Sequence, residues 1–475
     1  MNNESRLIAD FAAAGQGHVF AFWDQLDANA RQRLLADASE IDLQELEQLC
    51  AIHLDDSHSA TLDLQGLEPA PYIVHPDHGG DVELWKRAYL LGDEALRNGK
   101  VAAFTVAGGQ GTRLGFDAPK GTYPTSPILR KSLFQIFAEK ILSASRRYGV
   151  PFHWFILTSH VNNADTVAFF EEHNFFGLSR DVVHFFVQGR MPAVTDQGKI
   201  ILAAKDEIAM TPDGHGGSLR AMLRSGAVDI MRKAGIEMVS YFQVDNPLPN
   251  FFDPAFIGFH VMHASDMSSK MIPKRSPDEK IGVFCHQKGK LKVIEYSDLP
   301  EALATETDES GNIRFISGSI ALHVVSREFI ARVGGGEADY ALPFHRADKK
   351  VPTIDIQGNP VKPEKPNGVK FEMFVFDALP YAKHPVVMEF HRKDEFSPIK
   401  NPEGLDSPAA CSRDQVCQWT RWAIAAGVPL QADEAGWPGF TWEVSPLFAD
   451  SQAAFDAAWN ALSEKPEIKE GTVLR

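Results

Sequence analysis

The chain has 475 residues, of which 44% are hydrophobic and 23% are charged, and its formal net charge is −16. Because a single core rarely grows beyond about 250–300 residues, this length predicts several domains or one large domain with additions. The excess of acidic residues argues against binding to nucleic acid or to an anionic membrane surface, although a local group of cations would still hold an anionic ligand.

Residues 1–98 have the pattern of a helical region. Apolar residues recur at helical spacing among polar ones between residues 7 and 35. Asp42-Leu43-Gln44-Glu45 resembles a capping box at the start of a helix. Residues 82–98 form a further amphipathic pattern that stops at Gly99.

Residues 99–390 alternate between apolar runs and helical patterns, which is typical of an α/β fold with a mixed, mostly parallel sheet flanked by helices. The strand-like runs are 101–107, 154–158, 182–187, 238–244 and 281–285. The helical stretches between them are 133–143, 164–173 and 218–234, the first opened by Ser132 with Gln135 three residues on. Segment 308–312 and the glycines at 334–336 are predicted to be loops.

Residues 391–475 carry four tryptophans among short apolar runs, which predicts a small C-terminal subdomain around Trp419, Trp422, Trp437 and Trp442. The predicted organisation therefore has three parts: a helical region (1–98), a central domain (99–390) and this subdomain (391–475).

The four cysteines indicate reduced thiols in a cytosolic protein, because Cys50, Cys285, Cys411 and Cys417 form no CxxC pair or zinc-ligand cluster. No apolar run is long enough to span a membrane, and the first residues do not form a charged-then-apolar signal sequence. We therefore expect a cytoplasmic protein with no membrane partner. The sequence indicates no particular oligomeric state.

The most distinctive stretch is VAAFTVAGGQGTRLGFDAPKGT, at residues 101–122. A buried strand followed by glycines predicts a tight turn at the C-terminal edge of the sheet, where ligands of open α/β sheets bind. Exposed backbone N–H groups there, with Arg113 and Lys120 nearby, suit a polyphosphate. The stretch matches neither a Walker loop, since Phe116 follows Gly115, nor the dinucleotide fingerprint, which needs glycine in place of Leu114.

Together with further segments in the same order, this stretch resembles the UDP-sugar pyrophosphorylase family, and within it most closely the UDP-N-acetylglucosamine pyrophosphorylases. The resemblance covers roughly residues 80–405 and includes residues 131–136 (KSLFQI), 188–193 (QGRMPA), 212–217 (PDGHGG), 244–246 (VDN), 294–297 (IEYS), 365–372 (KPNGVKFE) and 394–401 (DEFSPIKN). It implies the Rossmann-like fold of nucleotide-diphospho-sugar transferases.

The resemblance also implies a uridylyltransferase that makes UDP-sugar and pyrophosphate from UTP and a sugar-1-phosphate, with Mg²⁺ or Mn²⁺. N-acetylglucosamine-1-phosphate is the expected acceptor. Glucose-1-phosphate or galactose-1-phosphate is the alternative, and a noncatalytic nucleotide-sugar binder is a third. UTP, the sugar phosphate and pyrophosphate are then the partners, and nucleic acid is not.

Uridylyl transfer joins two anions, so it needs charge neutralisation, alignment and a metal more than covalent chemistry. The resemblance places Lys120 on the phosphates and Lys400 on the diphosphate, and Arg113 is a second cation of the loop, with a structural tie as its alternative. Asp245 ends an apolar run, so its carboxylate is expected at the C-terminal sheet edge, where a hard oxygen suits Mg²⁺; capping a turn is its alternative.

The base and the sugar are assigned mainly by resemblance. Gln188 matches a glutamine that binds uracil, which suits an amide because it offers both a donor and an acceptor. Its companions are backbone groups of Gly108 and Gly109 for the base, Gly214 and His215 for base, ribose or sugar, and Gly282 and Glu295 for the sugar.

Two positions depart from the N-acetylglucosamine branch, which usually carries Asn where this chain has His215 and Ser319. Phe374 and Phe376 match aromatic residues of the sugar pocket, with core packing as their alternative. The departures weaken the choice of sugar and leave the choice of reaction unchanged. His345, His384 and His391 have no triad-like context and are interpreted as structural.

Overall fold

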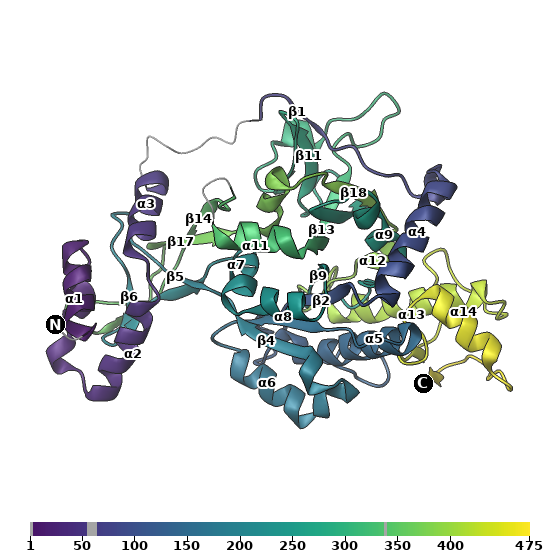
Figure 1. Cartoon of the computed structure of the whole chain (residues 1–475), viewed down its shortest axis with the longest axis horizontal. Coiled ribbons are helices and arrows are strands. Elements are labelled where there is room, and N and C mark those ends of the chain that lie inside the picture. The colour runs from purple at the N-terminus through teal and green to yellow at the C-terminus, as the bar shows by residue number, and fades with distance from the viewer. Residues whose placement is uncertain (1–2, 55–63, 337–339) are drawn as a thin grey trace. The chain divides into compact units, whose positions relative to one another are not determined.

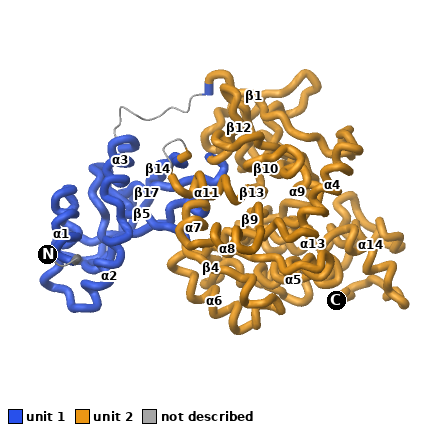
Figure 2. The backbone as a smooth tube through the Cα atoms, in the orientation of Figure 1, with its two compact units in different colours: residues 1–64, 188–218, 341–377 blue, residues 65–187, 219–340, 378–475 orange. Residues whose placement is uncertain are grey.

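The computed structural model describes residues 3–54, 64–336 and 340–475. The chain divides into two compact units: unit 1 comprises residues 1–64, 188–218 and 341–377, and unit 2 comprises residues 65–187, 219–340 and 378–475 (Figure 2). The predicted helical region 1–98 includes residues 1–2 and 55–63, which lie outside the described residues. The boundaries predicted at residues 98 and 390 divide the sequence differently from these units and stay a prediction.

Unit 1 begins with the helices α1 (Asn3–Ala13), α2 (Ala28–Ser39) and α3 (Leu43–His53). The predicted cap of α3 is confirmed, because the carboxylate of Asp42 accepts hydrogen bonds from the backbone N–H groups of Gln44 and Glu45, both 3.0 Å long. The rings of Phe11 and Phe20 pack edge to face with centroids 5.4 Å apart, so this part of the chain buries its own apolar face.

The rest of unit 1 is built from short antiparallel strand pairs. The pairs are β5 (Arg190–Pro192) with β8 (Met210–Pro212), β6 (Leu202–Ala204) with β7 (Glu207–Ile208), β14 (Phe344–Lys349) with β17 (Gly368–Met373), and β15 (Thr353–Ile354) with β16 (Pro360–Val361). Backbone hydrogen bonds of 3.0 and 2.7 Å between Val194 and Val369 join the second and third chain segments of this unit.

The described residues of unit 2 build a ten-stranded sheet in the order β1-β11-β13-β9-β2-β3-β4, with β12 beside β11, and β10 beside both β13 and β18. The strands are β1 (Leu67–Pro69), β2 (Val101–Val106), β3 (Trp154–Thr158), β4 (Val183–Val187), β9 (Met238–Gln243), β10 (Met267–Pro273), β11 (Val283–Gln287), β12 (Lys290–Ile294), β13 (Ser317–Ser326) and β18 (Val386–Glu389).

The predicted fold class is confirmed. Strands β9, β2, β3 and β4 pair in parallel, as the alternation of strands and helices predicts. Strand β13 pairs antiparallel with β9, β10 and β11, which makes the sheet mixed. The C-terminal ends of β2 and β9 therefore lie side by side, and the two predicted phosphate-site segments follow these ends.

Helices of unit 2 flank this sheet (Figure 1). The side chain of Ser132 caps α5 by accepting the N–H of Gln135 at 3.1 Å, as predicted. Helices α4 and α9 approach so closely that a Cβ on Gly92 would lie 1.8 Å from the carbonyl oxygen of Pro254. The helices are α4 (Val82–Arg97), α5 (Leu133–Tyr148), α6 (Asn163–Glu172), α7 (Gly217–Arg224, which begins in unit 1), α8 (Ala227–Lys233), α9 (Pro254–Met262), α10 (Glu301–Ala304), α11 (Arg327–Gly335), α12 (Arg392–Glu395), α13 (Pro408–Ala425) and α14 (Gln452–Ala461).

Two local predictions in the central region are wrong. The single helix predicted at 218–234 is two helices, because Gly226 has a φ of +79°, which interrupts the helical path between α7 and α8. The glycines predicted as a loop at 334–336 instead end α11. A Cβ on Gly334 would lie 2.6 Å from the carbonyl oxygen of Leu219, so glycine is needed for the close approach of α11 to α7.

The C-terminal residues of unit 2 have a separate apolar cluster, as the tryptophan-rich pattern predicts. It includes Trp419, Trp422 and the fully buried Trp442, whose indole N–H donates to the hydroxyl of Thr420 at 2.9 Å. Strands β19 (Glu443–Val444) and β20 (Val473–Leu474) pair in parallel in the same C-terminal part of the chain. All four cysteines are free thiols, and three of them are buried. Throughout the part of the chain that the structure describes, no helix has the length and hydropathy to cross a membrane.

Candidate functional site

The glycine-rich loop after β2 folds back on itself at the sheet edge. The N–H of Gly111 donates to the carbonyl of Ala118 at 3.0 Å, and the N–H of Lys120 donates to the carbonyl of Gly109 at 3.1 Å. A Cβ on Gly111 would lie 2.8 Å from Phe116, so only glycine allows this return. The turn brings Lys120 back beside the exposed Gly109.

A residue that sequence reasoning missed, Asn162, holds this loop to the neighbouring strand. Its side-chain amide donates to the carbonyls of Ala107 at 2.9 Å and Gly109 at 3.3 Å, and its amide oxygen accepts the N–H of Ser159 at 2.8 Å. Asn162 is fully buried just after β3 and just before α6. A polar residue between a strand and a helix was the available signal, but its partner 53 residues away is not visible in the sequence.

Lys120 and Asp245 lie together at the ends of β2 and β9. The lysine ammonium is 3.1 Å from the carboxylate of Asp245, and the two side chains are 16% and 18% exposed. A Cβ on Gly121 would lie 2.2 Å from the ring of Phe134, so the backbone beside Lys120 is packed tightly against α5. A cation and a carboxylate from segments 125 residues apart therefore occupy one edge of the sheet.

The segment that carries Lys400 is attached to the same edge. The backbone N–H of Ile399 donates to the carbonyl of Asp245 at 2.8 Å. The buried amide of Asn246 donates to the carbonyl of Glu395 at 2.8 Å and accepts the N–H of Ser397 at 3.0 Å. The residue after the candidate metal ligand thus positions the chain that leads to Lys400.

The remaining predicted cations are open to solvent. The side chain of Lys400 is exposed and lies with its ammonium 5.6 Å from the ring centre of Phe396. Arg113 is exposed in a single 3-10 turn, residues Thr112–Leu114, of the glycine-rich loop. The structure therefore brings Lys120, Asp245 and the Lys400 segment together, with Arg113 in the adjoining loop.

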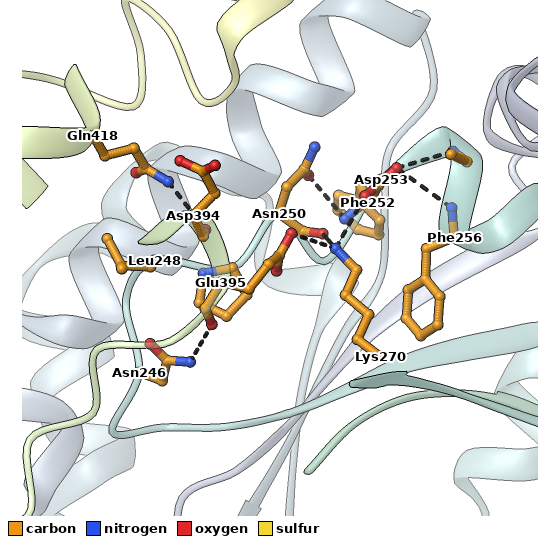
Figure 3. Close-up of polar contacts among 12 residues, drawn as sticks. Asn246, Leu248, Asn250, Phe252, Asp253, Phe256, Lys270, Asp394, Glu395 and Gln418 are labelled. Carbon is orange, nitrogen blue, oxygen red and sulfur yellow. Dashed lines mark hydrogen bonds and ion pairs between the residues drawn. The ribbon is translucent and has the colours of Figure 1, made fainter. Parts of the chain in front are cut away.

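Behind this segment lies a buried group of charges that the sequence analysis did not identify (Figure 3). The ammonium of Lys270, in the middle of β10, is 2.6 Å from the carboxylate of Glu395 and 3.0 Å from that of Asp253, the N-cap of α9. The Lys270 side chain is completely buried, and its ammonium lies 3.9 Å from the ring centre of Phe390. These contacts fix the start of the Lys400 segment to the sheet.

The electrostatic balance in this group follows from burial. Burial raises the pKa of Glu395 to about 7, against the lowering effect of the Lys270 ammonium. Burial lowers the pKa of Lys270, but the carboxylates of Asp253 and Glu395 outweigh it, so the lysine pKa lies above its ordinary value. Among the described atoms, Oε2 of Glu395 has no hydrogen-bond partner, which agrees with a carboxyl whose ionisation is opposed by its surroundings.

Three of the predicted sugar-side residues meet elsewhere in unit 2. Gly282 precedes β11, Glu295 follows β12, and Ser319 lies in β13. The N–H of Ser319 donates to the carbonyl of Gly282 at 2.8 Å, and a Cβ on Gly282 would lie 3.3 Å from Oε1 of Glu295. The Gly282 position therefore lacks room for a side chain beside the glutamate.

Gln188 and the remaining predicted sugar residues lie together in unit 1, whereas Gly108 and Gly109, predicted for the base, belong to the glycine-rich loop of unit 2. The side-chain amide of Gln188 donates to the carbonyl of Gly214 at 2.7 Å. Gly214 has a φ of +85°, and a Cβ there would lie 2.3 Å from the carbonyl oxygen of Met373. Both constraints require glycine at this position, and they tie the second chain segment of unit 1 to the third.

His215 is held between the two predicted aromatic residues. Its ring stacks on Phe374 with centroids 5.4 Å apart and meets Phe376 edge to face at 5.7 Å. Its Nδ1 accepts the N–H of Val375 at 3.2 Å. Burial lowers the pKa of His215 to about 4, so this imidazole is neutral at pH 7.

The residues at Asp245 fit a magnesium ion in their chemistry. Mg²⁺ takes hard oxygen ligands, usually one or two carboxylates together with substrate phosphates and water, and Asp245 offers one carboxylate beside a loop of exposed backbone N–H groups. In residues 3–54, 64–336 and 340–475, the sole group of three clustered metal-ligating side chains is a different one, formed by His75, Asp77 and His391.

Comparisons with known proteins show the family and the fold of the chain. A family model described as UTP–glucose-1-phosphate uridylyltransferase matches residues 82–406. The human UDP-N-acetylhexosamine pyrophosphorylase-like protein 1 is 37% identical over 482 residues, covering 95% of this chain and 94% of that protein. The UDP-N-acetylglucosamine pyrophosphorylase of Saccharomyces cerevisiae is 34% identical, covering 88% of this chain and 90% of that protein. The crystal structure of the Trypanosoma brucei UDP-N-acetylglucosamine pyrophosphorylase with an inhibitor superposes with a TM-score of 0.84 at 28% identity, covering 100% of this chain and 98% of that one.

Proposed function

The chain belongs to the UTP–glucose-1-phosphate uridylyltransferase family, and we propose that it transfers the uridylyl group of UTP to N-acetylglucosamine-1-phosphate in the cytoplasm. The phosphate oxygen of the sugar attacks the α-phosphorus of UTP, and pyrophosphate leaves. The observation that carries the proposal is the pairing of Lys120 with Asp245 beside the glycine-rich loop, in a chain whose relatives are named for this chemistry.

The cations of unit 2 act on the phosphates. Lys120 neutralises charge on the UTP phosphates or on the leaving pyrophosphate, and the neighbouring backbone N–H groups of the loop add oriented dipoles. Lys400 contacts the diphosphate, and its exposed side chain is free to reach a ligand while its backbone stays fixed. Arg113 adds a second loop cation.

Asp245 would hold a Mg²⁺ or Mn²⁺ ion. Such an ion would offset the negative charge of the phosphates. In the free protein the carboxylate of Asp245 contacts Lys120 instead, so the ammonium keeps the carboxylate oriented before the ion and nucleotide arrive.

Gln188 reads the uracil edge. One hydrogen of its amide N–H₂ is donated to the carbonyl of Gly214, which orients the amide and leaves Oε1 to accept the N3–H of uracil and the second N–H to donate. Cytosine has no hydrogen at N3, so it would bring an acceptor against an acceptor. Backbone groups of Gly108 and Gly109 add further contacts to the base.

Each of the two units carries residues that are candidates for selecting the sugar. In unit 2, Ser319 lies beside Gly282 and Glu295, the positions that match acetamide and hydroxyl contacts of the family. In unit 1, His215 and the aromatic pair Phe374 and Phe376 offer an apolar surface with a neutral imidazole. Ser319 is shorter than the asparagine of the relatives, so one hydrogen bond to the sugar is lost.

A panel assay of UTP with several sugar-1-phosphates, run on the parent and on Ser319→Asn, tests the proposal. A lost hydrogen bond to a neutral partner is worth about 0.5–1.5 kcal/mol, or roughly tenfold or less in kcat/KM. We therefore expect N-acetylglucosamine-1-phosphate to be used, with another hexose-1-phosphate within about a hundredfold, and Ser319→Asn to widen that gap.

Two other outcomes would contradict the proposal. Release of pyrophosphate with glucose-1-phosphate alone, unchanged by Ser319→Asn, would replace the acceptor and make His215 the marker of specificity. UDP-sugar binding without pyrophosphate release from any sugar-1-phosphate would reject the transferase and support a noncatalytic binder.

A further inference from the structure

Away from the proposed uridylyltransferase site, three side chains with metal-ligating atoms converge in unit 2. His75 precedes the 3-10 turn Pro76–His78, Asp77 lies within that turn, and His391 directly precedes α12. One ligand atom from each lies within 4.8 Å of the other two. Oδ2 of Asp77 is 2.8 Å from Nε2 of His391 and 3.7 Å from Nδ1 of His75.

The backbone on both sides of this cluster is held by the sheet. Ile73 forms backbone hydrogen bonds with Val387 at 2.9 Å and with Glu389 at 3.0 Å. The chain before His75 therefore lies alongside β18. The backbone N–H of His75 also donates to the buried carboxylate of Glu389 at 3.0 Å. The ligand positions are therefore set by strand pairing, as a preorganised site requires.

The cluster is open to solvent at Asp77 and packed against other side chains at the two histidines. The side chains of His75 and His391 are 20% and 22% exposed, whereas that of Asp77 is 68% exposed. The two imidazole rings lie 4.4 Å apart, and the ring of His75 also packs against Trp85 at 5.0 Å. A hydrated cation thus has a path to the imidazoles past the carboxylate.

We propose that His75, Asp77 and His391 bind a divalent transition-metal ion, with Zn²⁺ as the best match. The two imidazoles are borderline donors, which select zinc or cobalt over Mg²⁺, and a carboxylate oxygen is a third ligand that zinc also accepts. Bonds of about 2.0–2.2 Å place tetrahedral ligands about 3.4 Å apart, and the two measured separations of 2.8 and 3.7 Å lie on either side of that value. Water completes the coordination.

Binding requires only a local exchange of partners. Nδ1 of His75 accepts the backbone N–H of Asp77 at 3.2 Å, a long hydrogen bond that the metal bond replaces. Nε2 of His391 exchanges its contact with Asp77 for the shared ion. The ion then links the chain before α4 to the start of α12, and so ties down the residues that lead into the Lys400 segment.

Titration with Co²⁺, followed by its visible absorption in the presence of excess Mg²⁺, tests the site, because Mg²⁺ occupies hard oxygen sites and leaves imidazole sites available. The variants are His391→Ala and Asp77→Asn, with His263→Ala as the matched control. His263 is an exposed histidine of the same unit outside the cluster. We expect one tightly bound Co²⁺ in the parent and in the control, and at least tenfold weaker binding in the other two.

A second readout separates loss of the site from loss of the fold. Zn²⁺ should raise the midpoint of thermal unfolding of the parent and of the control, but not of Asp77→Asn, whose exposed side chain leaves the fold intact. A parent that binds no Co²⁺, or an Asp77→Asn variant that binds Co²⁺ and responds to Zn²⁺ like the parent, would overturn the proposal.

Discussion

Replacing Asn162 by alanine removes the side chain that fastens the glycine-rich loop to the sheet. Its amide makes three hydrogen bonds, of 2.8, 2.9 and 3.3 Å, and the side chain is fully buried. Truncation leaves the N–H of Ser159 and the carbonyl of Ala107 without their partner inside the protein, because both residues are also buried. The carbonyl of Gly109 is exposed enough for water to replace its bond.

The expected loss of stability follows from which of these groups are buried and which is exposed. Each buried group left without a partner costs about 1–3 kcal/mol, so the two buried groups together cost about 2–4 kcal/mol once partial hydration of the small void is allowed for. The loop should also lose its position relative to the phosphates. A misplacement of this kind lowers kcat/KM by about 10- to 100-fold.

Urea unfolding, followed by tryptophan fluorescence, gives the free energy of unfolding. The rate of pyrophosphate release from UTP gives kcat/KM. The matched control is Asn163→Ala, the next residue, whose side chain accepts a 2.7 Å hydrogen bond from Thr158 and has no bond to the loop. We expect the control to keep parent-like kcat/KM. If Asn162→Ala unfolds with the parent's free energy, or loses no more activity than Asn163→Ala, the reasoning about the loop is refuted.

Three further predictions concern single side chains. Lys120→Ala and Lys400→Ala should each lower turnover by about two to three orders of magnitude while circular dichroism stays unchanged; near-normal turnover in either would reject its role. Asp245→Asn should remove most Mg²⁺-dependent activity but leave UDP binding measurable by calorimetry, and an unchanged Mg²⁺ response would disprove the ligand assignment. Burial lowers the pKa of His260 to about 3. As the pH falls below about 6.5, the unfolded state therefore binds a proton before the folded state does. The free energy of unfolding falls between pH 6.5 and pH 3, by at most about 1.4 kcal/mol per pH unit. Urea titrations at pH 7 and pH 5 should show a steeper loss in the parent than in His260→Gln, and equal slopes would contradict the assignment.

Local features of the fold could be predicted from the sequence because each depends on neighbouring residues. The run before Ala107 is apolar on both faces, so it predicts a buried strand, and the glycines after it predict a turn. Asp42 and Ser132 precede helical patterns at the spacing of a cap, and both cap helices. Asp245 follows an apolar run and lies at the end of its strand.

Features set by distant contacts could not be predicted. Lys270 is the one charged residue of its strand, and its partner Glu395 is 125 residues away. The close approach of α11 to α7 at Gly334 and Leu219 joins distant residues, which no local pattern encodes. The predicted base and sugar residues are also divided between the two units, whereas a list of motifs treats them as one site.

Unit 1 is assembled from three pieces of chain, and this has a consequence for synthesis on the ribosome. The first piece ends at residue 64 and the last ends at residue 377, so 313 residues must be added before the unit is complete. At about 5–20 residues per second this takes about 15–60 s. Until the second piece, residues 188–218, has been made, Gln16 and His18 lack the backbone carbonyls of Gly198 and Ile200 that they bind in the finished fold. Helices α1 to α3 therefore emerge before the larger unit but complete their contacts only after most of it has been made, so they need chaperone protection for longer than a unit built from one continuous piece.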